Sequence, residues 1–316
     1  MTDITAIGEL LIDLTQVGQN DQKIPIMAAY PGGAPANVAV AASRLGANTA
    51  FIGKVGNDGF GGFLRQVLRD NQVNDQFLET GDSITTMAIV TVSEGGERSF
   101  QFVRGADRIL TSEELPADAL AQTKFFHFGS VSLTAEPARS ATLTAVHRAK
   151  AAGAIISYDP NYREALWNDI GEATYWMGLP LDLVDILKIS EEELPLLTGT
   201  ADLEDGAEWL QQKGIGLVMI TLGGNGAFCR FRDESFRVAG IHAKVADTNG
   251  AGDTFLGAVL SQLCRNNNPL NELTLDQMRQ IVFFANRAAA ITCSRSGANP
   301  AMPFLSQMDE GNCGNS

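Results

Sequence analysis

Short apolar runs recur along the chain, and each ends in polar or glycine-containing residues. The runs are TAIGELLID from Thr5, KFFHFGS from Lys124, GAIISYDP from Gly153, ILKIS from Ile186 and LVMITLG from Leu217. Runs of this length between turn residues predict buried strands, and stretches with helical spacing of apolar residues lie between them. Because strand and helix alternate, we predict an α/β fold with a mainly parallel sheet and helices on both faces.

Two segments depart from this alternation. Residues 83–105 contain two β-rich runs joined by Glu94-Gly95-Gly96-Glu97, which predicts a hairpin. Residues 14–31 are similarly non-helical. We expect both segments to form a small β-rich lid inserted into a single α/β domain that spans residues 1–316. Residues 307–316 show no periodicity and are expected to form a loose tail.

The charge of the chain narrows the choice of partners. Lys and Arg number 23 against 37 Asp and Glu, which gives a net charge of −14, and no long basic run occurs. A nucleic-acid partner is therefore not expected. A phosphorylated ligand is still compatible with this charge, because backbone amides act locally in a cleft.

The N-terminal residues and the spacing of the cysteines indicate the cellular compartment of the protein. The N-terminal stretch lacks a basic region and is broken by Gly8 and Glu9, so we expect neither a signal peptide nor a membrane partner, and we expect a cytoplasmic location. The cysteines have no CxxC spacing, which argues against a zinc ribbon and against a disulfide scaffold. They are Cys229, Cys264, Cys293 and Cys313.

The sharpest motif is DTNGAGDTFLGAVL, which starts at Asp247 and leads from small residues into a run with helical spacing. The N–H groups of Gly250, Ala251 and Gly252 at such a helix start can converge on an anion. Asp253 would lie beside that anion, where it could accept the proton of a hydroxyl that attacks a bound phosphoryl group. A capping role is the common alternative for such an Asp, but the length of the motif favours function.

Other phosphate and nucleophile motifs are absent from the sequence. GxxxxGK[ST], GxGxxG and GxSxG do not occur, which excludes the P-loop, dinucleotide-binding and nucleophile-elbow interpretations. Phosphoryl transfer at the glycine loop is the chemistry that these residues favour.

Together the motifs resemble the ribokinase-like, or PfkB, carbohydrate kinases. The resemblance covers nearly the whole chain, and within the family it looks most like the fructokinases. It implies a Rossmann-type core with a β-rich lid and an ATP-dependent enzyme that converts D-fructose to D-fructose 6-phosphate. The segments that carry it are DTNGAGD, PGGAPANVAVAASRLG from Pro31, FIGKVGNDGFG from Phe51, HFGSVSL from His127, YDPNYR from Tyr158, LKISEEEL from Leu187, ITLGGNGA from Ile220 and SRSGANPAMP from Ser294.

The resemblance also assigns residues to the reaction. Asp253 is implied as the general base, and the loop Gly250, Ala251 and Gly252, together with Arg163, is implied to hold the transferring phosphate. Asp13 also falls at the end of the first predicted strand, where open α/β sheets place their ligand crevice. The implied sugar-binding residues are Asp13, Gly32, Gly33, Asn37, Phe102 and Arg104.

ATP and cations complete the implied site. Glu193 stands where relatives have an acidic residue that organises Mg²⁺ through water. A monovalent cation, K⁺, is a further candidate cofactor. The implied ATP-binding residues are Ser190, Glu193, Thr221, Gly223, Gly226 and Asn286, and the implied cation loops contain Asp247, Asn249, Thr292, Arg295 and Gly297.

Alternatives to fructose phosphorylation are left open at this stage. Another substrate of the same fold, such as 2-keto-3-deoxygluconate, a different ketose or a nucleoside, is the nearest one. A catalytically silent sugar-binding or regulatory protein is the alternative of another class. The strand edges of the lid could also pair two copies into a homodimer.

Overall fold

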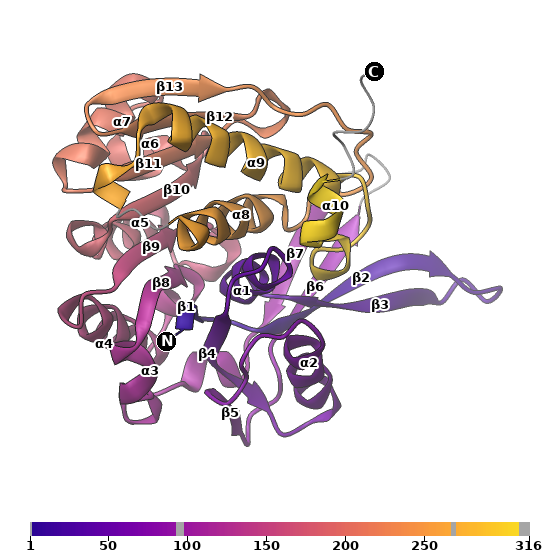
Figure 1. Ribbon diagram of the computed structural model, residues 1–316. Coiled ribbons are helices and arrows are strands. Elements are labelled where there is room, and N and C mark those ends of the chain that lie inside the picture. The colour runs from indigo at the N-terminus through magenta and orange to yellow at the C-terminus, as the bar shows by residue number, and fades with distance from the viewer. Residues whose placement is uncertain (1, 93–97, 267–269, 310–316) are drawn as a thin grey trace.

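The computed structural model describes residues 2–92, 98–266 and 270–309, and these form one large sheet between helices and a smaller sheet at its side (Figure 1). The large sheet has nine strands in the described residues. From one edge to the other they are β13 (Glu234–Val238), β12 (Ala227–Phe231), β11 (Leu217–Thr221), β10 (Ile186–Ser190), β9 (Ile155–Asp159), β8 (Thr123–Gly129), β1 (Thr2–Ile7), β4 (Thr49–Gly56) and β5 (Leu78–Gly81).

The large sheet is parallel from β11 to β5, and only its β12–β13 edge is antiparallel. β1 lies next to both β4 and β8, with Ile4 paired to Thr49 on one side and to Phe125 on the other. The carboxyl ends of the parallel strands therefore share one edge of the sheet, which is where ligands bind in open α/β folds.

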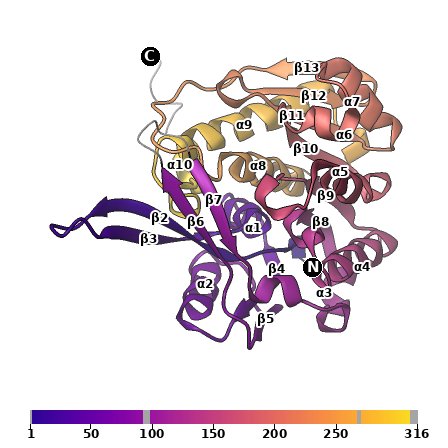
Figure 2. The same cartoon turned by 180° about the vertical axis from the view of Figure 1, so that it is seen from behind.

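Helices cover both faces of this sheet, as the alternating pattern predicts (Figures 1 and 2). Two clusters of buried apolar side chains show which helices pack on which face. One face carries α1 (Ala34–Arg44), α8 (Ala251–Arg265) and α9 (Leu275–Cys293), and the other carries α4 (Ala138–Ala151), α5 (Ile170–Gly178), α6 (Leu194–Thr198) and α7 (Leu203–Gln212). The shorter α3 (Ala117–Ala121) contacts β8, α2 (Gly59–Asp70) packs near β4, and α10 (Leu305–Asp309) lies near the end of the described chain.

The smaller sheet contains the strands expected for a lid. Its order is β3 (Pro25–Gly32), β2 (Leu11–Gln19), β6 (Met87–Val92) and β7 (Arg98–Val103). β2–β3 and β6–β7 are antiparallel pairs, whereas β2 and β6 run parallel, so the sheet is mixed. The β6–β7 pairing is that of the predicted hairpin, and its turn at Glu94-Gly95-Gly96-Glu97 lies outside the described residues.

One predicted strand is wrong. The run from Thr5 to Asp13 is split between two sheets, because the chain leaves the large sheet after Ile7 and enters the small one at Leu11. Gly8 lies at the break with a φ of 152°, a backbone conformation that side chains with a Cβ rarely adopt. Asp13 consequently reaches the site from the small sheet and not from the end of a core strand.

The predicted tail at residues 307–316 is described only in part. Its first three residues end α10, and residues 310–316 lie outside the described range. Within the part of the chain that the structure describes, every helix is too short or too polar to cross a membrane.

Candidate active site

The DTNGAGD motif lies at the amino end of α8, beside the carboxyl ends of β9 and β10. Gly250 precedes the helix in a left-handed conformation, with φ 74°, and Asp253 is in the first helical turn. The first backbone N–H groups of a helix have no partner within it, so they can donate to an anion placed before the helix. The structure thus places a carboxylate beside a helix start that is able to bind an anion, and residues 250–252 are called the anion-binding turn below.

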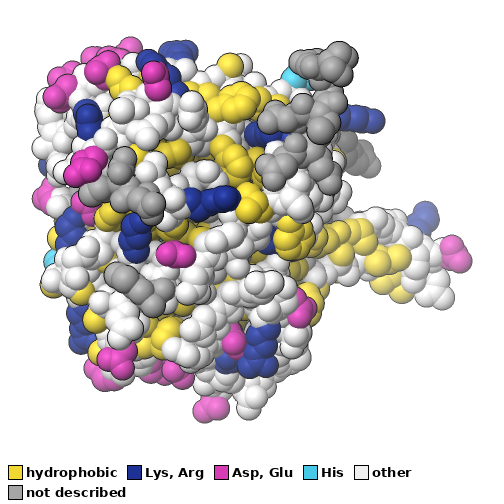
Figure 3. All heavy atoms as spheres, in the orientation of Figure 1, with side chains coloured by type: hydrophobic (Ala, Val, Ile, Leu, Met, Phe, Trp, Pro, Cys, Tyr) yellow, Lys and Arg dark blue, Asp and Glu magenta, His cyan; other side chains and the backbone are white. Residues whose placement is uncertain are grey.

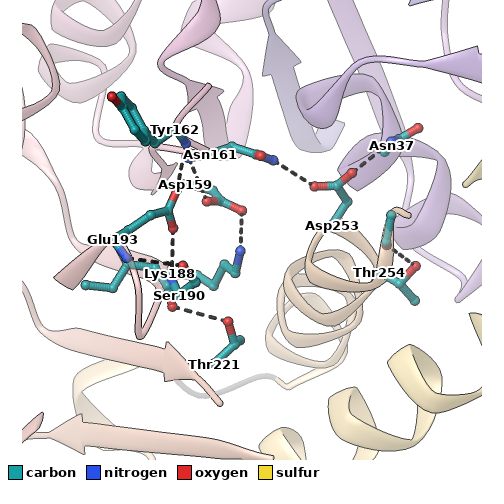
Figure 4. A network of polar contacts seen from close by, with 12 residues as sticks. Asn37, Asp159, Asn161, Tyr162, Lys188, Ser190, Glu193, Thr221, Asp253 and Thr254 are labelled. Atoms are coloured by element: carbon teal, nitrogen blue, oxygen red, sulfur yellow. Dashed lines mark hydrogen bonds and ion pairs between the residues drawn. The ribbon is translucent and has the colours of Figure 1, made fainter. Parts of the chain in front are cut away.

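Asp253 is held by amides from two other parts of the chain. Asn37 of α1 donates from Nδ2 to Asp253 Oδ2 over 2.8 Å, and Asn161, which follows β9, donates to Oδ1 over 3.1 Å (Figure 4). Burial and, to a lesser extent, the nearby Asp159 carboxylate raise the pKa of Asp253 to about 6 against the opposing effect of the Asn37 hydrogen bond. A buried carboxylate with this pKa is suited to accept a proton near neutral pH.

A further amide fixes the orientation of Asn37. The Asn299 side chain donates from Nδ2 to Asn37 Oδ1. Because Oδ1 of Asn37 accepts this bond, its NH₂ group is directed at Asp253. The loop that contains Asn299 therefore positions the base through Asn37.

A small cavity lies between Asp253 and the small sheet, and it is called the sugar cavity below after the ligand expected there. It brings together Asp13, Gly33, Asn37 and Phe102 of the expected sugar-binding set, together with Arg163 and Asn249. Gly32 borders it, since a Cβ on Gly32 would lie 2.5 Å from Asp13 Oδ2. The carboxylate and amide groups provide both acceptors and donors for sugar hydroxyls.

Asp13 is the carboxylate on the far side of this cavity. Its Oδ2 accepts from Asn249 Nδ2 over 3.4 Å, and burial raises its pKa to about 6, while the Asn249 bond and the Arg163 charge oppose the shift. Gly33 allows the start of α1 to lie close to the backbone of Glu9, because a Cβ at position 33 would lie 2.3 Å from the carbonyl oxygen of Glu9. Any larger residue at position 33 would displace the start of α1.

Arg104 is not among the residues that line the sugar cavity. Its guanidinium donates to Asp107 over 2.8 Å and to Thr134 over 2.9 Å, so it connects β7 to the segment after β8. Its expected contact with the sugar stays a prediction.

A larger cavity of about 410 Å³ lies on the other side of the α8 start. It contains four of the expected ATP-binding residues, namely Thr221, Gly223, Gly226 and Asn286, and it also reaches Ala251 and Gly252. Asn286 donates to the carbonyl oxygens of Val238 and Ala239, so its amide holds one wall of the cavity. The anion-binding turn separates this cavity from the sugar cavity.

Ser190 and Glu193 lie elsewhere, in a third pocket beside Arg163 and Lys188. Both oxygens of the Glu193 carboxylate accept backbone N–H groups, from Tyr162 over 2.6 Å and from Ser190 over 2.8 Å (Figure 4). Glu193 thereby fixes the loop that carries Asn161.

The expected cation loops lie next to each other. Asp247 accepts from the backbone N–H of Asn249 over 2.9 Å and from that of Gly297 over 3.1 Å. The Thr292 hydroxyl contacts the Thr254 hydroxyl at 3.0 Å, and Arg295 follows at the end of α9, with its backbone N–H donating to the Thr292 carbonyl. The described residues contain no group of three or more His, Cys, Asp or Glu arranged to hold a metal.

Sequence reasoning missed several residues of the site. Asn161 and Asp159 lie within the YDPNYR segment, and Lys188 is the one charged residue in the otherwise apolar strand ILKIS, which is a signal that could have been used. Glu9 was also missed; it lines the sugar cavity, and burial raises its pKa to about 7. Its Oε1 accepts the Ala34 N–H, and no described group bonds to its Oε2.

Comparisons with known proteins agree with this geometry. Residues 1–305 match the pfkB family of carbohydrate kinases. The chain is 42% identical over 308 residues to fructokinase-1 of Oryza sativa subsp. japonica, a match that covers 95% of this chain and 94% of that relative.

Solved structures are similar over the same length. The fructokinase of Xylella fastidiosa with bound ATP superposes with a TM-score of 0.90 at 31% identity, covering 98% of this chain and 97% of that one. A double mutant of the fructokinase of Vibrio cholerae, with fructose, ADP and a potassium ion bound, gives a TM-score of 0.87 at 33% identity, with the same coverage of 98% and 97%. The core and the small sheet are therefore both shared with these proteins.

Proposed function

Because the chain belongs to the pfkB family of carbohydrate kinases, we propose that it transfers the γ-phosphoryl group of ATP to the 6-hydroxyl of D-fructose. One observation carries the proposal. Asp253 lies where the sugar cavity meets the anion-binding turn of α8, and two amides fix its carboxylate there. The Vibrio cholerae relative, which binds fructose and ADP, supports the choice of substrates.

We propose a part of the reaction for each side of Asp253. Asp13 and Asn37 bind hydroxyls of the sugar, and Phe102 covers the cavity from the small sheet. Asp253 accepts the proton of the attacking hydroxyl as its oxygen bonds to the γ-phosphorus. The bond from phosphorus to the β–γ bridging oxygen breaks at the same time, and ADP leaves with that oxygen.

The anion-binding turn and Arg163 stabilise the charge of the transferring group. The N–H groups of Ala251 and Gly252 belong to the first turn of α8, and that of Gly250 directly precedes it; the Ala251 N–H also donates to the Thr248 carbonyl over 3.3 Å. The helix start therefore orients these groups before charge develops. Arg163 lines both the sugar cavity and the pocket of Ser190 and Glu193, and its planar guanidinium can donate two hydrogen bonds to one phosphoryl group.

Magnesium and potassium are the proposed cofactors. Glu193 would hold Mg²⁺ through water, and the ion would offset the charge of the triphosphate. The Glu193 oxygens already accept backbone N–H groups, which fits a role through water better than direct ligation. The loops of Asp247 and Gly297 are the proposed K⁺ site, as supported by the potassium ion in the Vibrio cholerae relative.

We also propose that two copies pair through the small sheet. The β2–β3 hairpin projects from the body of the molecule, and apolar side chains run along it (Figure 3). Val17, Ile24 and Ile26 are 56%, 54% and 48% exposed, an unusual concentration for a projecting strand pair. Light scattering after size exclusion tests this proposal, and a monomeric mass at micromolar concentration would contradict it.

A sugar panel tests the proposed reaction. ADP release is followed with Mg·ATP and fructose, glucose, ribose, 2-keto-3-deoxygluconate or adenosine, with and without K⁺. We expect the largest kcat/KM with fructose and a higher rate with K⁺. A faster rate with another substrate would keep the chemistry and replace fructose, whereas tight fructose binding without ADP release would indicate a sugar-binding protein.

A further inference from the structure

Lys188 carries a buried positive charge near the site, and the reaction proposed above gives it no role. It lies in the middle of β10, and only 7% of its side chain is exposed. Its Nζ donates to Asp159 Oδ2 over 2.9 Å (Figure 4). No other described group accepts from this ammonium, which has three N–H donors, so two of them are available to a ligand.

The position of Nζ shows what it faces. A Cβ placed on Gly252 would lie 2.8 Å from it, so the ammonium rests against the anion-binding turn at the start of α8. The absence of a side chain at position 252 is what leaves room for it. Lys188 also lines the open pocket that contains Asn161 and Arg163, and both of these residues border the sugar cavity as well.

The surroundings keep Lys188 charged. Burial alone would lower its pKa, but the carboxylates of Asp159, Glu193 and Asp253 outweigh burial and raise it. An ion pair with Lys188 requires one carboxylate, whereas three carboxylates lie near this ammonium. A purely structural partner for Asp159 would not need to lie against the turn.

We propose that Lys188 is a catalytic residue that binds the transferring phosphoryl group. Resting on the function proposed above, this inference adds a side-chain cation to the N–H groups of the turn. During transfer the phosphorus–oxygen bond to ADP breaks, the bond to the sugar oxygen forms, and the hydroxyl proton goes to Asp253. Lys188 keeps its own proton throughout and donates to a non-bridging oxygen of the phosphoryl group.

Nucleotide affinity tests this role without any sugar. Dissociation constants of ADP and of AMP-PCP, a non-hydrolysable ATP analogue, are measured by calorimetry with Mg²⁺ for the wild type and for Lys188→Met. We expect the affinity for AMP-PCP to fall about 10-fold and the affinity for ADP to change less than 2-fold, because only the analogue carries a γ-phosphate. An equal loss for both nucleotides, or no loss, would overturn the proposal.

Removing the partner of Lys188 separates catalysis from structure. Asp159→Asn keeps the ammonium, and the double variant Lys188→Met/Asp159→Asn removes both members of the buried ion pair together. We expect Lys188→Met and the double variant both to lower kcat about 100-fold, and Asp159→Asn to keep kcat within about 10-fold of wild type. Wild-type kcat in the double variant would show that Lys188 only neutralises Asp159, and would overturn the proposal.

A control separates this inference from the proposed substrate. Thermal unfolding of each variant establishes that it is folded, and Lys188→Arg is expected to restore part of the AMP-PCP affinity. If the wild type fails to phosphorylate fructose, the substrate is wrong, but the nucleotide measurement still tests Lys188, because it contains no sugar.

Discussion

Asn37 Nδ2 donates to Asp253 Oδ2 over 2.8 Å, joining two residues that lie 216 positions apart in the chain. Asn37 lies in the first turn of α1, which follows β3, and Asp253 lies in the first turn of α8, which follows the glycine loop. The contact therefore couples the sugar side of the site to the phosphate side.

Asp253→Asn removes the proposed base with little change in shape. We expect kcat with fructose to fall by at least about 10³-fold, because an amide cannot accept the hydroxyl proton. Fructose affinity and the unfolding temperature should change little. Asp276→Asn is the matched control, because Asp276 is exposed on α9, and this variant should keep wild-type kcat. Turnover near wild type in Asp253→Asn would remove this residue from the base role.

Asn37→Asp should be more harmful than Asn37→Ala. The alanine loses one hydrogen bond to Asp253, whereas the aspartate places a second carboxylate against it and raises the pKa of Asp253 further. We expect the acid side of the kcat profile to move to higher pH in both variants, and farther in Asn37→Asp. Profiles that coincide with wild type would show that Asn37 does not act on the base.

The pH dependence of kcat/KM should report the buried carboxylates of the free enzyme. Asp253 and Asp13 both have a pKa of about 6, and both must be ionised, one to accept a proton and the other to accept sugar hydroxyls. Activity is therefore expected to fall as the pH drops below about 6, with a slope that approaches two. Asp13→Asn should reduce that slope to one while lowering kcat/KM, and an unchanged slope would contradict the assignment.

The buried carboxyl of Glu9 should make the protein less stable as the pH rises. Burial raises the pKa of Glu9 from 4.5 to about 7, so the folded state binds more protons than the unfolded state in this interval. The free energy of unfolding must then fall as the pH rises between these two pKa values, by about 1.4 kcal/mol for each pH unit. Urea unfolding from pH 4 to 8 measures this slope.

Glu9→Gln is expected to remove about 3 kcal/mol of the fall in unfolding free energy over this pH interval, a value set by the pKa change of the Glu9 carboxyl. Glu208→Gln changes an exposed position and serves as the control for removing a carboxylate. A slope in Glu9→Gln equal to that of the wild type would show that Glu9 is not responsible for it.

Much of the fold could be predicted because its core strands are short, apolar and bounded by turn residues. β9, β10 and β11 lie within the predicted runs, β8 begins one residue before its run, and α8 begins in the glycine loop as predicted. The change of sheet at Gly8 was not predicted, because the short interruption by Gly8 and Glu9 between apolar residues does not distinguish one strand from two. The change of sheet depends on tertiary pairing of β2 with β6, which local periodicity does not encode.

The site was predictable where a motif holds several residues together. The anion-binding turn and Asp253 come from one such motif, and Asp13, Gly33 and Asn37 meet in one cavity as the resemblance implies. Lys188 and Asn161 were missed because each acts through a contact with a distant element: Lys188 through Gly252 of α8, and Asn161 through Asp253. Arg104 shows the reverse case, since its neighbours Asp107 and Thr134 hold it outside the cavity.

The most direct test of the account is to identify the product formed from uniformly ¹³C-labelled D-fructose and Mg·ATP by NMR. Phosphorus coupling at C6, in a product that appears in step with ADP, is the predicted result, because Asp253 is proposed to accept the proton of the 6-hydroxyl. Coupling at C1 would contradict the proposed orientation of the sugar, and ADP release without any labelled phosphate ester would contradict the proposed transfer itself.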